Sequence, residues 1–112
     1  MPLRFSPSTV ALTDAATITV AASKGNLFTI TLGGNRTLGN PTGYLGDGQK
    51  IIFRVKQDAT GSRTLAFGST YRFSTSLPSP TVSTASGSID YLGFMYHQGD
   101  DRWDFVAQTL GF

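Results

Sequence analysis

The sequence predicts an all-β fold, an antiparallel β-sandwich of jelly-roll type. Three observations indicate it: polar and apolar residues alternate over short runs, turn residues separate these runs, and strong helix formers are scarce. All seven acidic residues are aspartates, so glutamate, a good helix former, is absent. No stretch keeps a helical period for more than about two turns. With 112 residues, of which 39% are hydrophobic, the chain is expected to form one domain around one core.

The expected strands are short and follow the two-residue period of an extended chain. In the run 27–32, alternate apolar residues share one face, and the run 50–56 repeats this pattern. Further strands are expected at 17–20, 63–67, 70–73, 89–98 and 102–108. The loop 58–62 is expected to close a hairpin. Eight to ten strands spaced about 8–12 residues apart are typical of a sandwich or jelly roll.

Residues 1–8 are expected to form an extended arm ahead of a single β-sandwich domain at 9–112. Prolines flank the apolar part of this arm and reduce the entropy that it loses when it binds. Leu3, Arg4 and Phe5 have no strand context of their own, so they are candidate residues for docking onto another surface.

Composition excludes several classes of partner and site. Charged residues make up 14% of the chain and the formal net charge is +2, which argues against a nucleic-acid partner. No run approaches the roughly 18 apolar residues of a membrane helix. The chain has no cysteine, which excludes disulfides, thiolate catalysis and cysteine metal sites.

Catalytic residues are hard to place in this sequence. His97 is the only histidine, so any histidine-based scheme must use it, and Ser88 and Asp90 lie nearby in sequence. A triad is defined by spatial roles and not by proximity in sequence, so His97 is interpreted as an ordinary polar residue at a strand end. Most aspartates fall in turns, which their short side chains favour.

Metal and cofactor sites are not predicted either. Asp100, Asp101 and Asp104 supply clustered oxygens of the kind that Ca²⁺ prefers, but no known loop spacing joins them. The glycines at 33–34 and 46–48 match neither the phosphate-binding loop nor the dinucleotide fingerprint. The sequence therefore predicts no catalytic residue, no cofactor and no metal.

The run 50–56 carries a basic face. Lys50, Arg54 and Lys56 alternate with apolar residues and so share one side of the strand. Two interpretations stay open: a solvated sheet face, or a patch that docks onto an acidic protein surface. Under the second, Arg54 and Lys56 are candidate contact residues.

The run 89–97 has two largely apolar faces. An antiparallel strand with one solvated face would alternate apolar with polar residues, and this run does not. Either it lies between two protein layers, or one face is buried between subunits. Aromatic residues are enriched at interface cores, which favours a homo-oligomer, with a trimer expected. The candidate interface residues are Tyr91, Leu92, Phe94, Tyr96 and Trp103.

Five short motifs occur in a fairly specific order and spacing: GNRTLGNP at 34–41, GDGQ at 46–49, IFRVKQDATGSRTL at 52–65, DYLGF at 90–94 and WDF at 103–105. Together they resemble β-rich modules of tailed-phage virions. The resemblance spans about residues 16–112 and extends to tail-fibre modules, head fibres and capsid-decorating proteins.

The resemblance implies a virion structural protein and not an enzyme. Because the chain is expected to be free-standing, the leading interpretation is a capsid decoration (cement) protein, assembled in the host cytoplasm. It would bind the phage major capsid protein on the capsid surface as a homotrimer. The alternative is a tail-fibre or spike module for host-receptor binding, which exposed aromatic residues lining a sugar cleft would favour. A carbohydrate-active enzyme is a distant third.

Overall fold

The structure is a computed structural model that describes residues 8–44 and 46–112. In these residues the chain forms nine strands and one short 3-10 helix, Ala22–Lys24. The strands are β1 (Thr9–Ala11), β2 (Thr17–Ile18), β3 (Leu27–Leu32), β4 (Arg36–Leu38), β5 (Lys50–Gln57), β6 (Leu65–Phe67), β7 (Tyr71–Arg72), β8 (Ile89–His97) and β9 (Arg102–Thr109). The all-β prediction is confirmed, and most strands lie where the sequence alternates.

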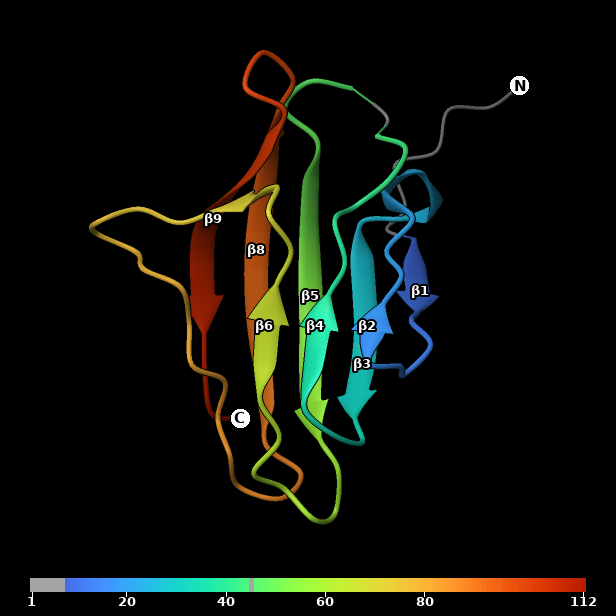
Figure 1. Cartoon of the computed structure of the whole chain (residues 1–112), viewed down its shortest axis with the longest axis vertical. Coiled ribbons are helices and arrows are strands. Elements are labelled where there is room, and N and C mark those ends of the chain that lie inside the picture. Colours follow the sequence, from blue (N-terminus) through green and yellow to red (C-terminus); the bar gives the residue numbers. More distant parts are fainter. Residues whose placement is uncertain (1–7, 45) are drawn as a thin grey trace.

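The strands form two sheets that lie in two layers. The larger sheet has six strands in the order β1-β3-β5-β8-β9-β7, and the smaller has three in the order β2-β4-β6. Figure 1 shows the smaller sheet lying over the middle of the larger one. The core fills the space between them, so each strand of the larger sheet has an inner face toward the core and an outer face away from it.

From β1 to β6, consecutive strands alternate between the two sheets. Neighbours within a sheet are therefore two strands apart in sequence, and they run parallel: β1 with β3 with β5, and β2 with β4 with β6. Figure 1 shows the chain passing back and forth between the two sheets in this segment. β7 also runs parallel to its neighbour β9. The prediction of an antiparallel arrangement is wrong for these strands.

The loop 58–62 shows the reason for this error. It was expected to close a hairpin, but it carries the chain from β5 in the larger sheet to β6 in the smaller one. Alternation identifies which side chains are buried, but it does not identify which strands pair.

The predicted final hairpin is confirmed. β8 pairs antiparallel with both β5 and β9. Between Gly93 and Phe94 the register with β9 shifts, because Gly93 faces Ala107 while Phe94 faces Phe105. Val106 is the extra residue of this bulge and is 52% exposed.

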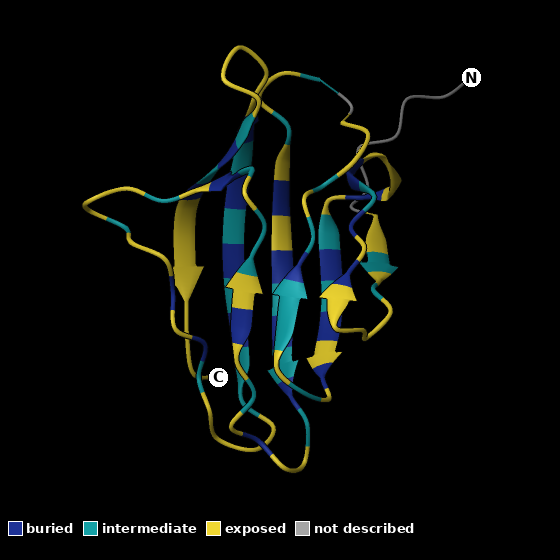
Figure 2. Ribbon diagram, in the orientation of Figure 1, coloured by how far each residue is buried: buried dark blue, intermediate teal, exposed yellow. Residues whose placement is uncertain are grey.

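The core is largely aromatic at its centre. Figure 2 shows buried and less buried residues alternating along β3, β5 and β8. Phe94 is 1% exposed, and its ring lies 5.0 to 6.2 Å, centroid to centroid, from five other rings. These five belong to Phe53, Phe67, Tyr71, Phe73 and Phe105.

Two buried polar side chains fix the irregular segments to the sheet. Gln57 donates through Nε2 to the carbonyls of Arg63 and Ser83, at 2.8 and 2.9 Å, and its Oε1 accepts from the Arg63 amide. The Asp90 carboxylate accepts from the backbone amides of Ser83 and Gly111. Buried polar groups need such partners, and here they tie the chain after β7 and the C-terminal residues to β5 and β8.

The predicted arm lies almost wholly outside the described residues, and with it the docking candidates Leu3, Arg4 and Phe5. Its last residue, Ser8, is described. The Ser8 carbonyl accepts hydrogen bonds from the amides of Asn26 and Leu27, which places it at the edge of the larger sheet beside β3.

Candidate binding surfaces

The predicted basic face lies on the outer side of β5. Arg54 and Lys56 point away from the core, and Lys50 is exposed at the start of the strand. The Arg54 Nε donates to the Tyr91 hydroxyl at 3.2 Å. Lys56 stands in register with Thr31 on one side and Ile89 on the other.

Two arginines that follow β5 in the sequence are paired with aspartates and do not extend this basic face. Arg63 forms an ion pair with Asp58 at 3.1 Å. Arg72 binds Asp104 and Asp100 at 2.6 and 2.9 Å. The basic face is therefore confined to β5.

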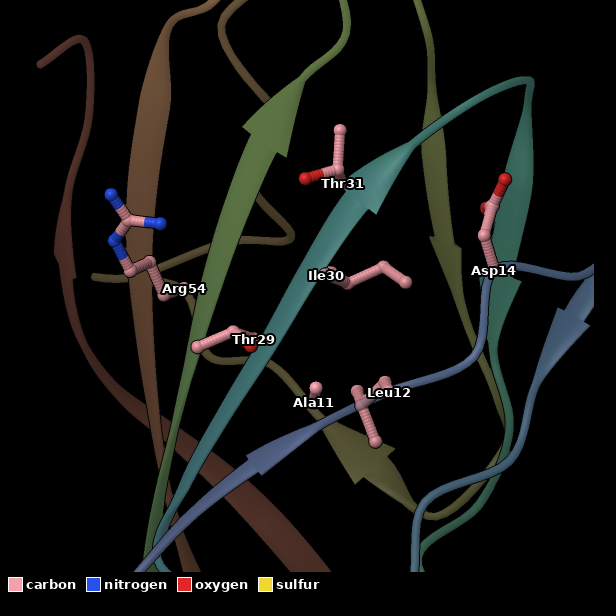
Figure 3. A pocket seen from close by; sticks show the side chains of 7 residues that line it. All are labelled: Ala11, Leu12, Asp14, Thr29, Ile30, Thr31 and Arg54. Carbon is pink, nitrogen blue, oxygen red and sulfur yellow. The ribbon is translucent and has the colours of Figure 1, made fainter.

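An open hollow of about 320 Å³ borders Arg54 on the outer side of β3. It exists because β1 pairs only with Leu27–Thr29, so that the last half of β3 extends beyond it. Figure 3 shows Arg54 and Asp14 at opposite ends of the hollow, with threonine and aliphatic side chains between them. The Asp14 carboxylate is occupied by Arg36, through bonds of 2.8 and 3.0 Å, and this contact keeps the pKa of Asp14 below its usual value. The hollow therefore presents the guanidinium of Arg54, but the Asp14 carboxylate is already bound by Arg36 and the two lining residues do not form an acid–base pair.

The outer face of the larger sheet carries a row of apolar positions. Leu27, Ile52, Gly93 and Ala107 stand side by side on four neighbouring strands. Ile52 is 43% exposed, and a shallow hollow of about 190 Å³ lies over Gly93 and Ala107. The register therefore places a continuous apolar row on the outside of the described sheet.

The predicted interface residues divide between the two faces of the sheet. Leu92, Phe94, Tyr96 and Trp103 are 0 to 5% exposed, and their side chains fill the core of the single chain. They are not accessible to a second copy in this fold, so the interface interpretation is corrected for all four. Tyr91 lies on the outer face, beside Ile52 and against the ring of Phe112.

The residues weighed as a catalytic triad do not meet. Ser88 and Asp90 lie at the start of β8 and His97 at its end, about 25 Å away for an extended strand of this length. The Ser88 hydroxyl donates to the carbonyl of Ala85, and His97 Nδ1 accepts from the Asp100 amide. The structure does not assemble this trio.

The three clustered aspartates are also engaged individually. Asp100 and Asp104 bind Arg72, while Asp101 accepts from the Tyr96 hydroxyl at 2.7 Å. No group of three or more metal-ligating side chains occurs among residues 8–44 and 46–112. In the same part of the chain, no helix is long and apolar enough to cross a membrane.

Sequence reasoning missed Tyr44. This residue lies in a glycine-rich connection that the periodicity left without structure. In the fold its ring stacks on Tyr96, with centroids 4.5 Å apart, and it is 42% exposed. An aromatic residue within a polar turn segment is unusual and could have drawn attention to Tyr44, but the sequence does not indicate which residue its ring contacts.

Comparison with known proteins gives one match. No curated protein and no solved structure is significantly similar to the chain. Residues 8–101 match a protein family described as "Putative phage tail fibre C-terminal domain". The match covers most of the chain and includes β1 to β8 in full, and it ends just before β9. The resemblance to virion structural proteins of tailed phages is therefore confirmed, and the chain belongs to this family of phage tail fibre C-terminal domains.

Proposed function

We propose that the chain is the terminal module of a phage tail fibre and contacts the host surface. The family match over residues 8–101 carries this proposal, because the family is described by its place in the tail. The leading sequence interpretation was capsid decoration. The match supports its alternative, the tail-fibre module, better, and nothing in the match names the capsid.

The proposed role is contact and not catalysis. The fold supplies a rigid two-sheet scaffold with several exposed features on its outside. Hydrogen bonds hold Ser88 and Asp90 at the start of β8 and His97 at its end, so the three side chains do not meet. A terminal module of this kind binds through preorganised surfaces, which loses less entropy than ordering a flexible segment.

We also propose that the chain self-associates, as a homotrimer, through the outer face of the larger sheet. The apolar row of Leu27, Ile52, Gly93 and Ala107 supports it, since an exposed isoleucine beside a shallow apolar hollow forms a surface that neighbouring copies around a three-fold axis can cover. A repeated contact in a trimer would raise the avidity of any host-binding site it carries.

Competition for adsorption tests the host-contact proposal. Host cells are incubated with the purified chain before phage is added, and free phage is counted over time. The chain should slow adsorption in proportion to its concentration, because it occupies the same receptors. A matched amount of heat-unfolded chain is the control. Unchanged adsorption at saturating concentrations of the folded, self-associated chain would contradict host contact.

A further inference from the structure

Two segments meet at the end of the molecule where β5 begins and β8 ends. One contains Tyr44 and residues 46–49, and the other is the turn 98–101 between β8 and β9. Figures 1 and 2 show them side by side, largely exposed, at one end of the long axis. We call this end the tip.

Hydrogen bonds attach residues 47–49 to the end of β8 and to the 98–101 turn. The Asp47 carboxylate accepts from the Gln98 amide at 2.8 Å. The Gly48 amide donates to the Tyr96 carbonyl, and the Tyr96 amide donates to the Gln49 carbonyl, both at 2.8 Å. Residues 47–49 are therefore held directly on β8, and Tyr44 joins them through its ring contact with Tyr96.

A stack of three aromatic rings runs from the core to the surface of the tip. Trp103 is 2% exposed and lies 4.8 Å from Tyr96, centroid to centroid. Tyr96 in turn lies 4.5 Å from Tyr44, at an interplanar angle of 32°. Because Tyr44 is 42% exposed, the stack ends in a ring supported from within and open to solvent. Such a ring presents a flat apolar face at little entropic cost.

Two carboxylates lie around Tyr96, the ring on which Tyr44 stacks. The Tyr96 hydroxyl donates a hydrogen bond to Asp101 Oδ1 at 2.7 Å, and Asp47 Oδ1 accepts a hydrogen bond from the Gln98 amide. The second carboxylate oxygen of each aspartate accepts no hydrogen bond from the described residues. The Asp101 carboxylate, with smaller effects of Tyr44 and Asp47, raises the pKa of Tyr96 to about 12. The hydroxyl therefore stays a donor at neutral pH and fixes the orientation of Asp101.

We propose that the tip binds a saccharide, with one sugar ring on the exposed face of Tyr44 and its hydroxyls donating to Asp47 and Asp101. A sugar ring has an apolar C–H face and an edge of hydroxyl donors, which matches an aromatic face bordered by carboxylate acceptors. The inference rests on the proposed function, because it names the chemistry of the host-surface contact.

A cationic ligand is the main competitor, since aromatic rings and carboxylates also bind ammonium groups. The charge at the tip does not decide between the two, because Arg72 pairs with both Asp100 and Asp104 while Asp47 and Asp101 form no ion pair with the described residues. The aromatic surface does. Ammonium ligands are typically held in a cage of several aromatic faces, and Tyr44 is the one exposed ring of this stack, since Tyr96 and Trp103 are 5% and 2% exposed. A single open ring face suits a sugar better than a cation.

The test is direct binding, independent of the virion. The full chain is applied to an array of bacterial surface oligosaccharides, and the strongest binder is titrated while the fluorescence of Trp103, the only tryptophan, is followed. A shift in Trp103 emission is expected, because the ligand would sit on the same aromatic stack. Thermal unfolding of each variant checks that the fold is intact.

Three variants locate the site. Tyr44→Ala should weaken binding at least about tenfold, while Tyr44→Phe, which keeps the ring, should stay within about threefold. Val106→Ala is the control, because Val106 is at least as exposed but lies at the β9 bulge, away from the tip and outside the apolar row, and it should bind as the parent does.

Three results would overturn the inference: no oligosaccharide bound on the array, full binding by Tyr44→Ala, or displacement of the bound sugar by millimolar choline. If the chain still competes for phage adsorption while the array stays blank, only the saccharide assignment fails. If the array gives a Tyr44-dependent binder while adsorption is unaffected, only the host-contact proposal fails.

Discussion

The carboxylate of Asp90 accepts a hydrogen bond of 2.6 Å from the backbone amide of Ser83. Its other oxygen accepts from the amide of Gly111 at 2.9 Å, and Asp90 itself is 2% exposed. One buried side chain on β8 therefore holds both the strandless segment that precedes β8 and the C-terminal residues. Neither segment forms a β-strand of its own in the described part of the chain, so neither has a full set of sheet hydrogen bonds.

Replacement of Asp90 by alanine should destabilise the chain by about 2–4 kcal/mol. It leaves the amides of Ser83 and Gly111 without an acceptor, at a cost of about 1–3 kcal/mol each. The measurement is urea unfolding followed by circular dichroism. Ser79→Ala, an exposed position in the same connecting segment, should change the unfolding free energy by less than about 0.5 kcal/mol. Equal stability of the two variants would show that Asp90 does not hold these segments.

Replacement of Phe94 by alanine should cost about 3–5 kcal/mol, because its ring contacts five other rings at the centre of the core. Phe94→Leu, which keeps most of the apolar volume, should cost less and stay folded. Val106→Ala is the matched control, since Val106 is 52% exposed at the bulge opposite. The unfolding midpoints in urea give the comparison, and a Phe94→Ala variant as stable as Val106→Ala would contradict the central place of Phe94 in the core.

Acid should destabilise the fold below about pH 4. Hydrogen bonds from Arg36 to Asp14, from Arg63 to Asp58 and from Arg72 to Asp100 keep the pKa of each carboxyl below its usual 3.8. A carboxyl with a lowered pKa stabilises the folded chain above the pKa of the unfolded state. That stabilisation is lost as the pH falls through the folded pKa.

The thermal midpoint should therefore change little between pH 7 and 5 and fall at lower pH. Asp14→Asn removes one of these titrating groups, so its midpoint should fall less steeply over the acid range than that of the parent. Because the pairs are partly exposed, added salt should reduce the difference. A midpoint that rises on acidification would contradict the signs of all three pKa shifts.

Self-association through the outer face should be sensitive to charge at its centre. Ile52→Lys places a positive charge in the apolar row and should convert oligomer to monomer in size-exclusion chromatography with light scattering at micromolar concentration. Thr31→Lys adds the same charge on the outer side of β3, away from the row, and should leave the oligomer intact. A parent chain that is already monomeric under these conditions would rule out the proposed contact.

The sequence predicted most strands but not their partners. Phe28, Phe53 and Leu92 alternate with more polar or more exposed neighbours, so their inward direction follows from the period alone. The parallel pairing of β3 with β5 does not, because the connection passes through β4 in the other sheet. Short alternating runs do not indicate that consecutive strands will lie in different sheets.

The candidate surfaces were predictable only in part. Both faces of β8 are apolar, so the sequence did not reveal that Leu92 and Phe94 face the core while Tyr91 faces outward. That choice depends on the smaller sheet, whose strands are two or three residues long and cover one side only. Tyr44 lies in a connection without periodicity, and its contact with Tyr96 spans 52 residues of sequence.

Immuno-gold labelling of intact virions tests the central claim, the tail location, most directly. Antibodies raised against the purified chain are applied to whole phage and viewed by electron microscopy, with antibodies against the major capsid protein as the positional control. Gold is expected at the tail, in few copies per particle and at the ends of fibres. Dense labelling distributed over the head, with bare tails, would contradict the tail-fibre account and restore capsid decoration.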